Sequence, residues 1–128
     1  MRVMILAKST PDTENFDRGQ EGFEAMAHFT QELINAGVLL ADGALEPSSK
    51  GARVRFEGSS RTVIDGPFTE AKELVAGYWI WQVRSLDEAI EWLKQAPFGG
   101  GEFEIRPVFE TPDAWPELAA PGSATGQP

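Results

Sequence analysis

The sequence predicts an α+β domain with the ferredoxin-like order β-α-β-β-α-β, into which a β-hairpin is inserted. Four apolar segments of strand length are combined with two segments whose apolar residues recur every three or four positions. A further pair of short segments, separated by a glycine-containing turn, lies between the second and third of these strands. The chain has 128 residues, which is the usual length of one domain with its own hydrophobic core.

The charge and the rarest residue types exclude several classes of function. The formal net charge is −9, and an acidic chain repels the phosphate backbone, so we expect no nucleic-acid partner. The chain has no cysteine and one histidine, which excludes cysteine-based zinc sites and a multi-histidine site within one chain. We therefore expect no metal and no cofactor. The apolar run at the N-terminus is too short for a signal peptide or a membrane span, so we expect a cytoplasmic protein without a membrane partner.

The first part of the chain predicts a strand, a helix and a second strand. Residues 2–8 are apolar on both faces, which is typical of a buried strand. Residues 9–18 contain a proline and three acids and predict a loop long enough to border a pocket. Residues 21–36 predict a helix that Gly37 ends, and residues 38–45 predict a strand.

One face of this helix should cover the sheet. Its apolar stripe consists of residues at three- and four-residue steps, namely Phe23, Met26, Ala27, Thr30, Leu33 and Ile34. Phe29 lies at the edge of this stripe. His28 lies on the opposite side, where we expect a surface histidine.

The inserted hairpin and the strand after it differ in polarity. Residues 52–56 alternate apolar and basic residues, as a half-exposed strand does, and should pair with residues 61–64. The arginines of this hairpin discourage edge-to-edge pairing; they are Arg53, Arg55 and Arg61. Residues 74–83 carry apolar side chains on both faces, which is typical of a central strand that is covered twice.

The last elements complete the predicted domain. Ser85 and Glu88 form a capping box at the start of the second helix. Residues 102–109 predict the last strand, and its proline places that strand at a sheet edge. From residue 111 the composition shifts to Pro, Ala, Gly and Ser. The domain should therefore cover residues 1–110, and residues 111–128 should form a flexible tail.

Two helices can cover only one face of such a sheet. The aromatic belt of Tyr78, Trp79 and Trp81 suggests that the second face is also apolar, and a second copy of the sheet is the simplest cover. The sequence therefore predicts a homodimer. We expect Trp79 and Trp81 in the dimer core rather than in a stacking site.

The segment Asp65-Gly66-Pro67-Phe68 is the main candidate for a functional site. Gly66 permits a tight turn, Pro67 fixes φ, and the Asp65 carboxylate can accept backbone N–H bonds two residues further on. A stiff turn that holds an acid between two core strands suits a function. Asp65 is either a general acid or base near Phe68 and Tyr78, or only the carboxylate that holds the turn.

Several charged residues extend this candidate site. Glu70, Lys72 and Glu73 either line the same pocket or are solvated charges on one turn of helix. Arg106 either binds an anionic group of a substrate or pairs with a neighbouring charge across the sheet.

Through these residues the chain resembles the DGPF group of the YCII-related proteins. The match rests on Asp65-Gly66-Pro67-Phe68, Glu70, Lys72-Glu73 and Gly77-Tyr78. Supporting matches are Ala36-Gly37-Val38-Leu39, Leu45-Glu46-Pro47-Ser48, Leu86-Asp87-Glu88-Ala89 and Glu104-Ile105-Arg106-Pro107. The resemblance covers about residues 1–110 and implies a ferredoxin-like fold that forms a dimeric α/β barrel.

The resemblance bears on activity and on partners as well. In the better-studied YCII branch, a His–Asp pair is proposed as catalytic. Counting from Gly37 and Pro97 places those positions at Met26 and Ala96, neither of which can transfer a proton, so the pair does not carry over. Some DGPF proteins are encoded beside, or fused to, extracytoplasmic-function sigma factors, which implies a sigma factor as a partner.

Two hypotheses on function follow. The first is a dimer with a small-molecule pocket bordered by the DGPF loop, residues 65–73, in which Asp65 catalyses proton transfer without a metal. The residues expected to contact the ligand are Phe68, Glu70, Lys72, Tyr78 and Arg106. The second hypothesis is a regulatory protein that binds a partner such as a sigma factor. A third hypothesis is a dimer that has a structural role and binds no ligand.

Overall fold

The computed structural model describes residues 1–14 and 19–110, so the tail predicted at residues 111–128 and part of the loop predicted at residues 9–18 lie outside them. The elements in chain order are β1 (Arg2–Ser9), α1 (Gly19–Asn35), β2 (Leu39–Ala44), the 3₁₀ turn η1 (Ser48–Lys50), β3 (Ala52–Glu57), β4 (Ser60–Asp65), β5 (Leu74–Gln82), α2 (Leu86–Lys94) and β6 (Phe103–Pro107). This order confirms the predicted α+β class and is consistent with a ferredoxin-like domain that carries an inserted hairpin.

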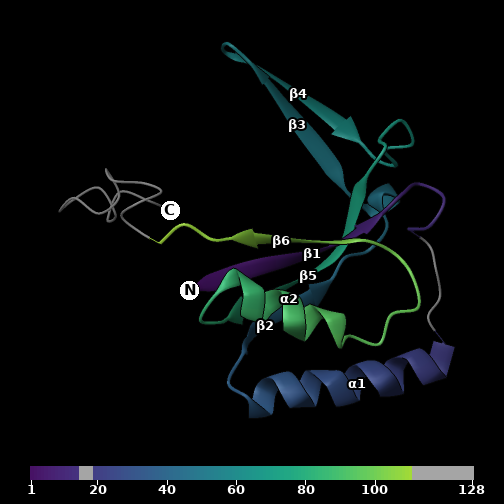
Figure 1. Cartoon of the computed structure of the whole chain (residues 1–128). Helices are drawn as coiled ribbons and strands as arrows, with labels where there is room; N and C mark the ends of the chain where they lie inside the picture. The colour runs from purple at the N-terminus through teal and green to yellow at the C-terminus, as the bar shows by residue number, and fades with distance from the viewer. Residues whose placement is uncertain (15–18, 111–128) are drawn as a thin grey trace.

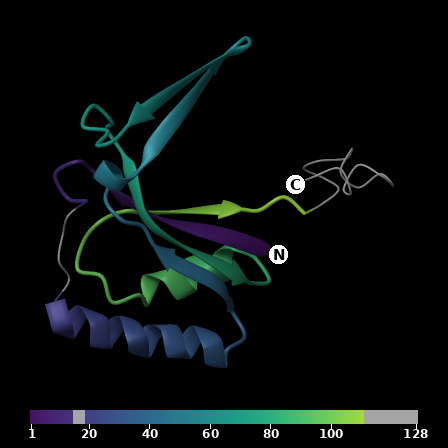
Figure 2. The same cartoon turned by 180° about the vertical axis from the view of Figure 1, so that it is seen from behind.

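The main sheet has four strands in the order β2-β5-β1-β6, and every neighbouring pair is antiparallel. Both helices lie on one side of this sheet (Figure 1). The strand β6 lies at the edge, as its proline predicts. The hairpin β3–β4 forms a separate two-stranded sheet that projects away from the helices, as the view from behind also shows (Figure 2). Among the described helices, none is long and apolar enough to cross a membrane.

The hydrophobic core fills the space between the sheet and the two helices. Its buried members are Val3, Ile5, Phe29, Leu33, Val38, Trp79, Trp81, Val83 and Ala89. The Phe29 ring meets the Trp79 ring edge-on at 5.8 Å between centroids, and Trp79 stacks on Trp81 at 5.3 Å. These aromatic contacts join α1 to the central strand β5.

The stripe predicted for α1 is rotated in the structure. Phe29, expected at the stripe edge, is 3% exposed, whereas the predicted stripe members Phe23 and Ile34 are 66% and 51% exposed. The helix has apolar residues on two adjacent arcs, so periodicity alone does not choose between them. The contact of Phe29 with Trp79 chooses the arc that faces the sheet.

The prediction that Trp79 and Trp81 lie in a dimer core is wrong. Both side chains are on the helix-covered face and are 8% and 0% exposed in the single chain. Strand alternation correctly separates these two residues from Tyr78 and Ile80. It does not say which of the two faces the helices cover.

The hairpin is more exposed than predicted. Val54, Phe56 and Val63 are 52%, 67% and 65% exposed, because within residues 1–14 and 19–110 the strands β3 and β4 pair only with each other. The prediction that the DGPF loop lies between two core strands is therefore wrong. It connects an exposed hairpin to the central strand β5.

The predicted cap of α2 is present, with one change of partner. Ser85 Oγ accepts the Glu88 N–H at 3.1 Å, but the Glu88 carboxylate accepts the N–H of Arg84 at 2.7 Å instead of that of Ser85. This hydrogen bond, and that from the Arg84 side chain, lower the pKa of Glu88. The start of α2, where β5 ends, is thereby fixed.

Candidate functional site

The DGPF loop is held by a hydrogen-bond relay that reaches two other loops. The Phe68 N–H donates to Ser48 Oγ at 3.1 Å. Ser48 in turn donates from its own N–H and its hydroxyl to the two carboxylate oxygens of Glu14, at 2.6 and 2.9 Å. The loop after β1, the turn η1 and the DGPF loop are therefore tied together through one serine.

Ser48 has the role that the sequence predicted for Asp65. The residue two positions after Asp65 is Pro67, which has no N–H to donate to the predicted turn. The Phe68 N–H, three residues after Asp65, donates to Ser48, and the Gly66 N–H donates to the Gly51 carbonyl at 3.0 Å. Asp65 itself is exposed at the end of β4. Within the described parts of the chain its carboxylate has no hydrogen bond or ion pair. The prediction that this carboxylate holds the turn is therefore wrong.

Gly66 is required by the close approach of η1. A Cβ at this position would overlap the carbonyl oxygen of Ser48 and would also lie 3.3 Å from the Gly51 carbonyl oxygen. The Gly66–Pro67 peptide bond is cis. The backbone contact explains why a residue without a side chain stands at this position of the motif.

Phe68 packs beneath the hairpin. Its half-buried ring lies under the guanidinium of Arg53, with 3.9 Å between the Arg53 Cζ atom and the ring centroid. This cation–π contact ties the loop to β3. Phe68 thus has a structural partner within the chain.

One of the charges after the motif, Glu73, belongs to an ion-pair network on the open side of the sheet. Lys8 pairs with Glu104 at 3.2 Å and with Glu73 at 3.5 Å, and Arg106 pairs with Glu104 at 3.0 Å. The hydrogen bond to Glu104 raises the pKa of Lys8, and the bonds from Arg106 and Lys8 lower the pKa of Glu104.

Arg106 therefore pairs with a charge on its own strand, two residues away, and not with one across the sheet. Glu70 and Lys72 are exposed and lie on a turn and a bend rather than on a turn of helix. His28 is a surface residue, as predicted, and pairs with Glu32 at 3.0 Å.

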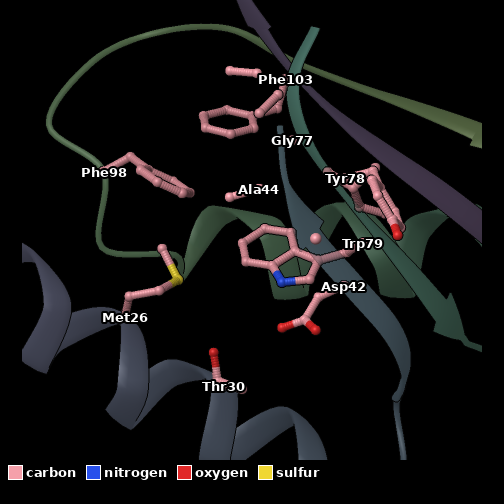
Figure 3. Close-up of a pocket in the computed structure, with 13 residues that line it drawn as sticks. Met26, Thr30, Asp42, Ala44, Gly77, Tyr78, Trp79, Phe98 and Phe103 are labelled. Carbon is pink, nitrogen blue, oxygen red and sulfur yellow. The ribbon is translucent and has the colours of Figure 1, made fainter. Parts of the chain in front are cut away.

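A cavity of about 290 Å³ lies elsewhere, between the sheet, α1 and the segment that leads into β6 (Figure 3). Its lining is mostly apolar and comes from five regions of the chain: Ile5, Ala7, Met26, Thr30, Asp42, Gly43, Ala44, Ala76, Gly77, Tyr78, Trp79, Phe98 and Phe103. Of the six predicted site residues, Tyr78 lines this cavity. Asp65, Phe68, Glu70, Lys72 and Arg106 do not.

The polar end of the cavity is built by a cross-strand pair and a helix residue. Asp42 of β2 lies opposite Trp79 of β5, so both side chains stand on the helix-covered face. Thr30 of α1 faces them across the gap. Figure 3 shows the Asp42 carboxylate, the Thr30 hydroxyl and the indole nitrogen of Trp79 turned toward the same space.

Small residues in the strands make room for the hollow. A Cβ at Gly43 would lie 2.7 Å from the Tyr78 ring, and a Cβ at Gly77 would lie 2.9 Å from the Gly43 carbonyl oxygen. Gly43 lies opposite Tyr78 on the open face, where the Tyr78 ring occupies the space over it, whereas Gly77 is on the helix-covered face with Trp79 and leaves room at the cavity. Glycine inside a strand indicates such a close approach, and this was the signal that could have found the site.

The positions counted for the catalytic pair of the YCII branch are apolar here. Met26 lines the cavity, and Ala96 packs against the core. The acid of the cavity is instead Asp42, on a different element. Whatever this cavity does, it does not use a His–Asp pair at those two positions.

The comparison with known proteins agrees with the motif. Residues 1–112 match the model of the YCII-related domain, so the chain belongs to the YCII-related family. A protein of Rhizobium meliloti (strain 1021), described as uncharacterised, is 33% identical over 81 residues. That alignment covers 61% of this chain and 65% of the relative, which is less than two thirds of the relative's length. The family prediction is confirmed.

Proposed function

We propose that this protein binds a small organic molecule in the cavity between α1 and the main sheet. The observation that carries the proposal is a largely apolar hollow of about 290 Å³ with polar groups from two strands and a helix at one end. That volume lies at the lower limit of the usual range for ligand sites, so it suits a ligand of about one ring. The proposed ligand site is therefore the cavity and not the DGPF loop.

The DGPF loop then serves to position β5, whose Trp79 side chain lies at the cavity. Catalysis by Asp65, with Phe68, Glu70, Lys72 and Arg106 as ligand contacts, stays a prediction. These residues lie outside the cavity lining. Turnover by Asp65 would need a substrate that reaches an exposed carboxylate at the end of the hairpin.

The site can be tested by filling it. Ala44 lines the cavity, so Ala44→Phe should abolish binding of a small neutral probe such as 2-phenylethanol, as measured by saturation-transfer NMR. Ala52→Phe is the matched control, because Ala52 is exposed on the hairpin. Binding that survives Ala44→Phe, or that is lost equally in both variants, would place the ligand elsewhere.

We also propose that the protein is a homodimer that pairs through the open sheet face as a dimeric α/β barrel. The centre of this face is apolar and half-buried, and consists of Met4, Leu6, Tyr78 and Ile80. Its rim carries both signs of charge, including Lys8, Glu104 and Arg106. A two-fold axis can bring opposite charges of such a rim together.

The dimer is tested by one substitution at the centre of the face. Ile80→Lys should convert the dimer to a monomer in sedimentation velocity, because two charges would be buried against each other. Ile34→Lys is the control, since Ile34 is 51% exposed on α1. A wild-type protein that sediments as a monomer would exclude this assembly.

Binding to a protein partner is a second candidate function, and the hairpin supports it. One face of the hairpin exposes Val54, Phe56 and Val63, and in the described part of the chain these side chains are not part of the hydrophobic core. The resemblance names a sigma factor as the partner class. Phe56→Ser should then weaken co-elution with a purified extracytoplasmic-function sigma factor, whereas Phe23→Ser, at an exposed position of α1, should not.

A further inference from the structure

We propose that the cavity selects a small organic amine: a cationic nitrogen on an apolar, ring-sized body. This inference rests on the proposed function, since it names the ligand class of the same site. It follows from the distribution of charge and of unpaired polar groups along the cavity wall.

The cavity wall carries a negative charge and no positive one. Of its described lining residues, Asp42 is the one that is charged at neutral pH, and no lysine or arginine belongs to the lining. The chain as a whole carries a formal net charge of −9, which adds to the repulsion of an anion. A ligand carboxylate or phosphate would meet Asp42 with no cation to offset it.

Asp42 is exposed on the edge strand β2, so its carboxylate is open to solvent and can be reached by a ligand. Among the described residues it forms no ion pair and no hydrogen bond, although Trp79 lies directly opposite it in the sheet. The Thr30 hydroxyl likewise has no partner in the described chain. A protonated amine has N–H donors for both oxygens, and a charge-assisted hydrogen bond is stronger than a neutral one.

The opposite end of the cavity is aromatic. Phe98 stacks on Phe103 at 4.4 Å between centroids, and Trp79 lies 6.1 Å from Phe98. Figure 3 shows Trp79 between these rings and the Asp42–Thr30 end. An apolar body packs against Phe98, Phe103 and Met26, while the Trp79 face also attracts a nearby cation. The wall is thus polarised along its length, as an amphipathic amine is.

The test uses three probes that share a benzene ring and a short side chain: 2-phenylethylamine, 2-phenylethanol and phenylacetate. At about pH 7 they are a cation, a neutral molecule and an anion. We expect the amine to bind the wild-type chain about tenfold or more tightly than phenylacetate, by isothermal titration calorimetry. Asp42→Asn should remove this preference and leave the affinity for 2-phenylethanol unchanged. Asp65→Asn, an exposed acid outside the cavity, should change neither.

The outcomes separate the two proposals. Equal binding of the three probes, or tighter binding of phenylacetate, overturns the amine inference while the cavity remains a ligand site. A preference for the amine that survives Asp42→Asn also overturns it. If no probe binds the wild-type chain, or if the probes bind the wild type and Ala44→Phe equally well, both the amine inference and the proposed function are wrong.

Discussion

The DGPF loop and the cavity are two regions of one small domain that differ in what their polar groups do. In the DGPF loop three residues have partners within the chain: Gly66 abuts η1, Phe68 is held by Ser48 and covered by Arg53, and Glu73 pairs with Lys8. Asp65 is the exception, since it is exposed and has no side-chain partner among the described residues. In the cavity, Asp42 and Thr30 face a hollow without partners among the described residues. A conspicuous motif can therefore be architectural, while a ligand site consists of inconspicuous residues with unused hydrogen-bonding capacity.

The largest expected effect comes from Gly66→Ala. The added methyl would overlap the backbone carbonyl of Ser48, which cannot move without moving η1. We expect the free energy of unfolding in urea to fall by about 3 kcal/mol or more. Gly99→Ala is the control, because a Cβ there would meet no atom within 4 Å. A loss below about 1 kcal/mol would show that the DGPF loop is not held in this way.

A smaller loss of stability is expected from Ser48→Ala. The substitution removes the acceptor of the Phe68 N–H and one donor to Glu14 in a partly buried place, so unfolding should become easier by about 1–3 kcal/mol. Ser49→Ala, at the exposed neighbouring position, should stay within about 0.5 kcal/mol. If the two variants are equally stable, the relay does not contribute to holding the loop.

In the cavity, a substitution should lower ligand affinity without lowering stability. Thr30→Val keeps the volume of the side chain and removes its hydroxyl, so the melting temperature should hold while the affinity for 2-phenylethylamine falls about fivefold. Thr62→Val on the exposed hairpin is the matched control and should change neither. Reduced stability with unchanged affinity would give Thr30 the structural role and would remove the contrast between the two regions.

The sequence predicts the elements of this fold well because their signals are local. The order of strands and helices, the Ser85 cap and the alternation along β5 all depend on residues within a few positions of one another. The family is also predicted, because the motif Asp65-Gly66-Pro67-Phe68 is contiguous. Such signals do not need the tertiary structure to be known.

The features that the sequence does not predict depend on contacts between residues that are distant in the chain. The arc of α1 that is buried is chosen by Trp79, and the turn of the DGPF loop is held by Ser48, 20 positions before Phe68. A local Asx turn at Asp65 was the natural expectation, but the tertiary hydrogen bond replaced it. The cavity joins Thr30, Asp42 and Trp79 from three elements, and no spacing rule connects them.

The smallest expected effect concerns the ion-pair network of Lys8, Glu73, Glu104 and Arg106. Because Arg106 and Lys8 lower the pKa of Glu104 below its ordinary value of 4.5, the folded state gains stability above that value and loses it as the pH falls through the lowered pKa. Glu104→Gln should therefore be less stable than wild type at about pH 6 in urea unfolding, and the difference should shrink as the pH falls through the lowered pKa of Glu104. Glu102→Gln, exposed and next to β6, should follow the wild-type curve. Ligand affinity should not change in either variant, since neither residue lines the cavity. A Glu104→Gln curve that runs parallel to wild type would mean that these charges are solvated independently, and that the ion pairs do not contribute to holding the DGPF loop.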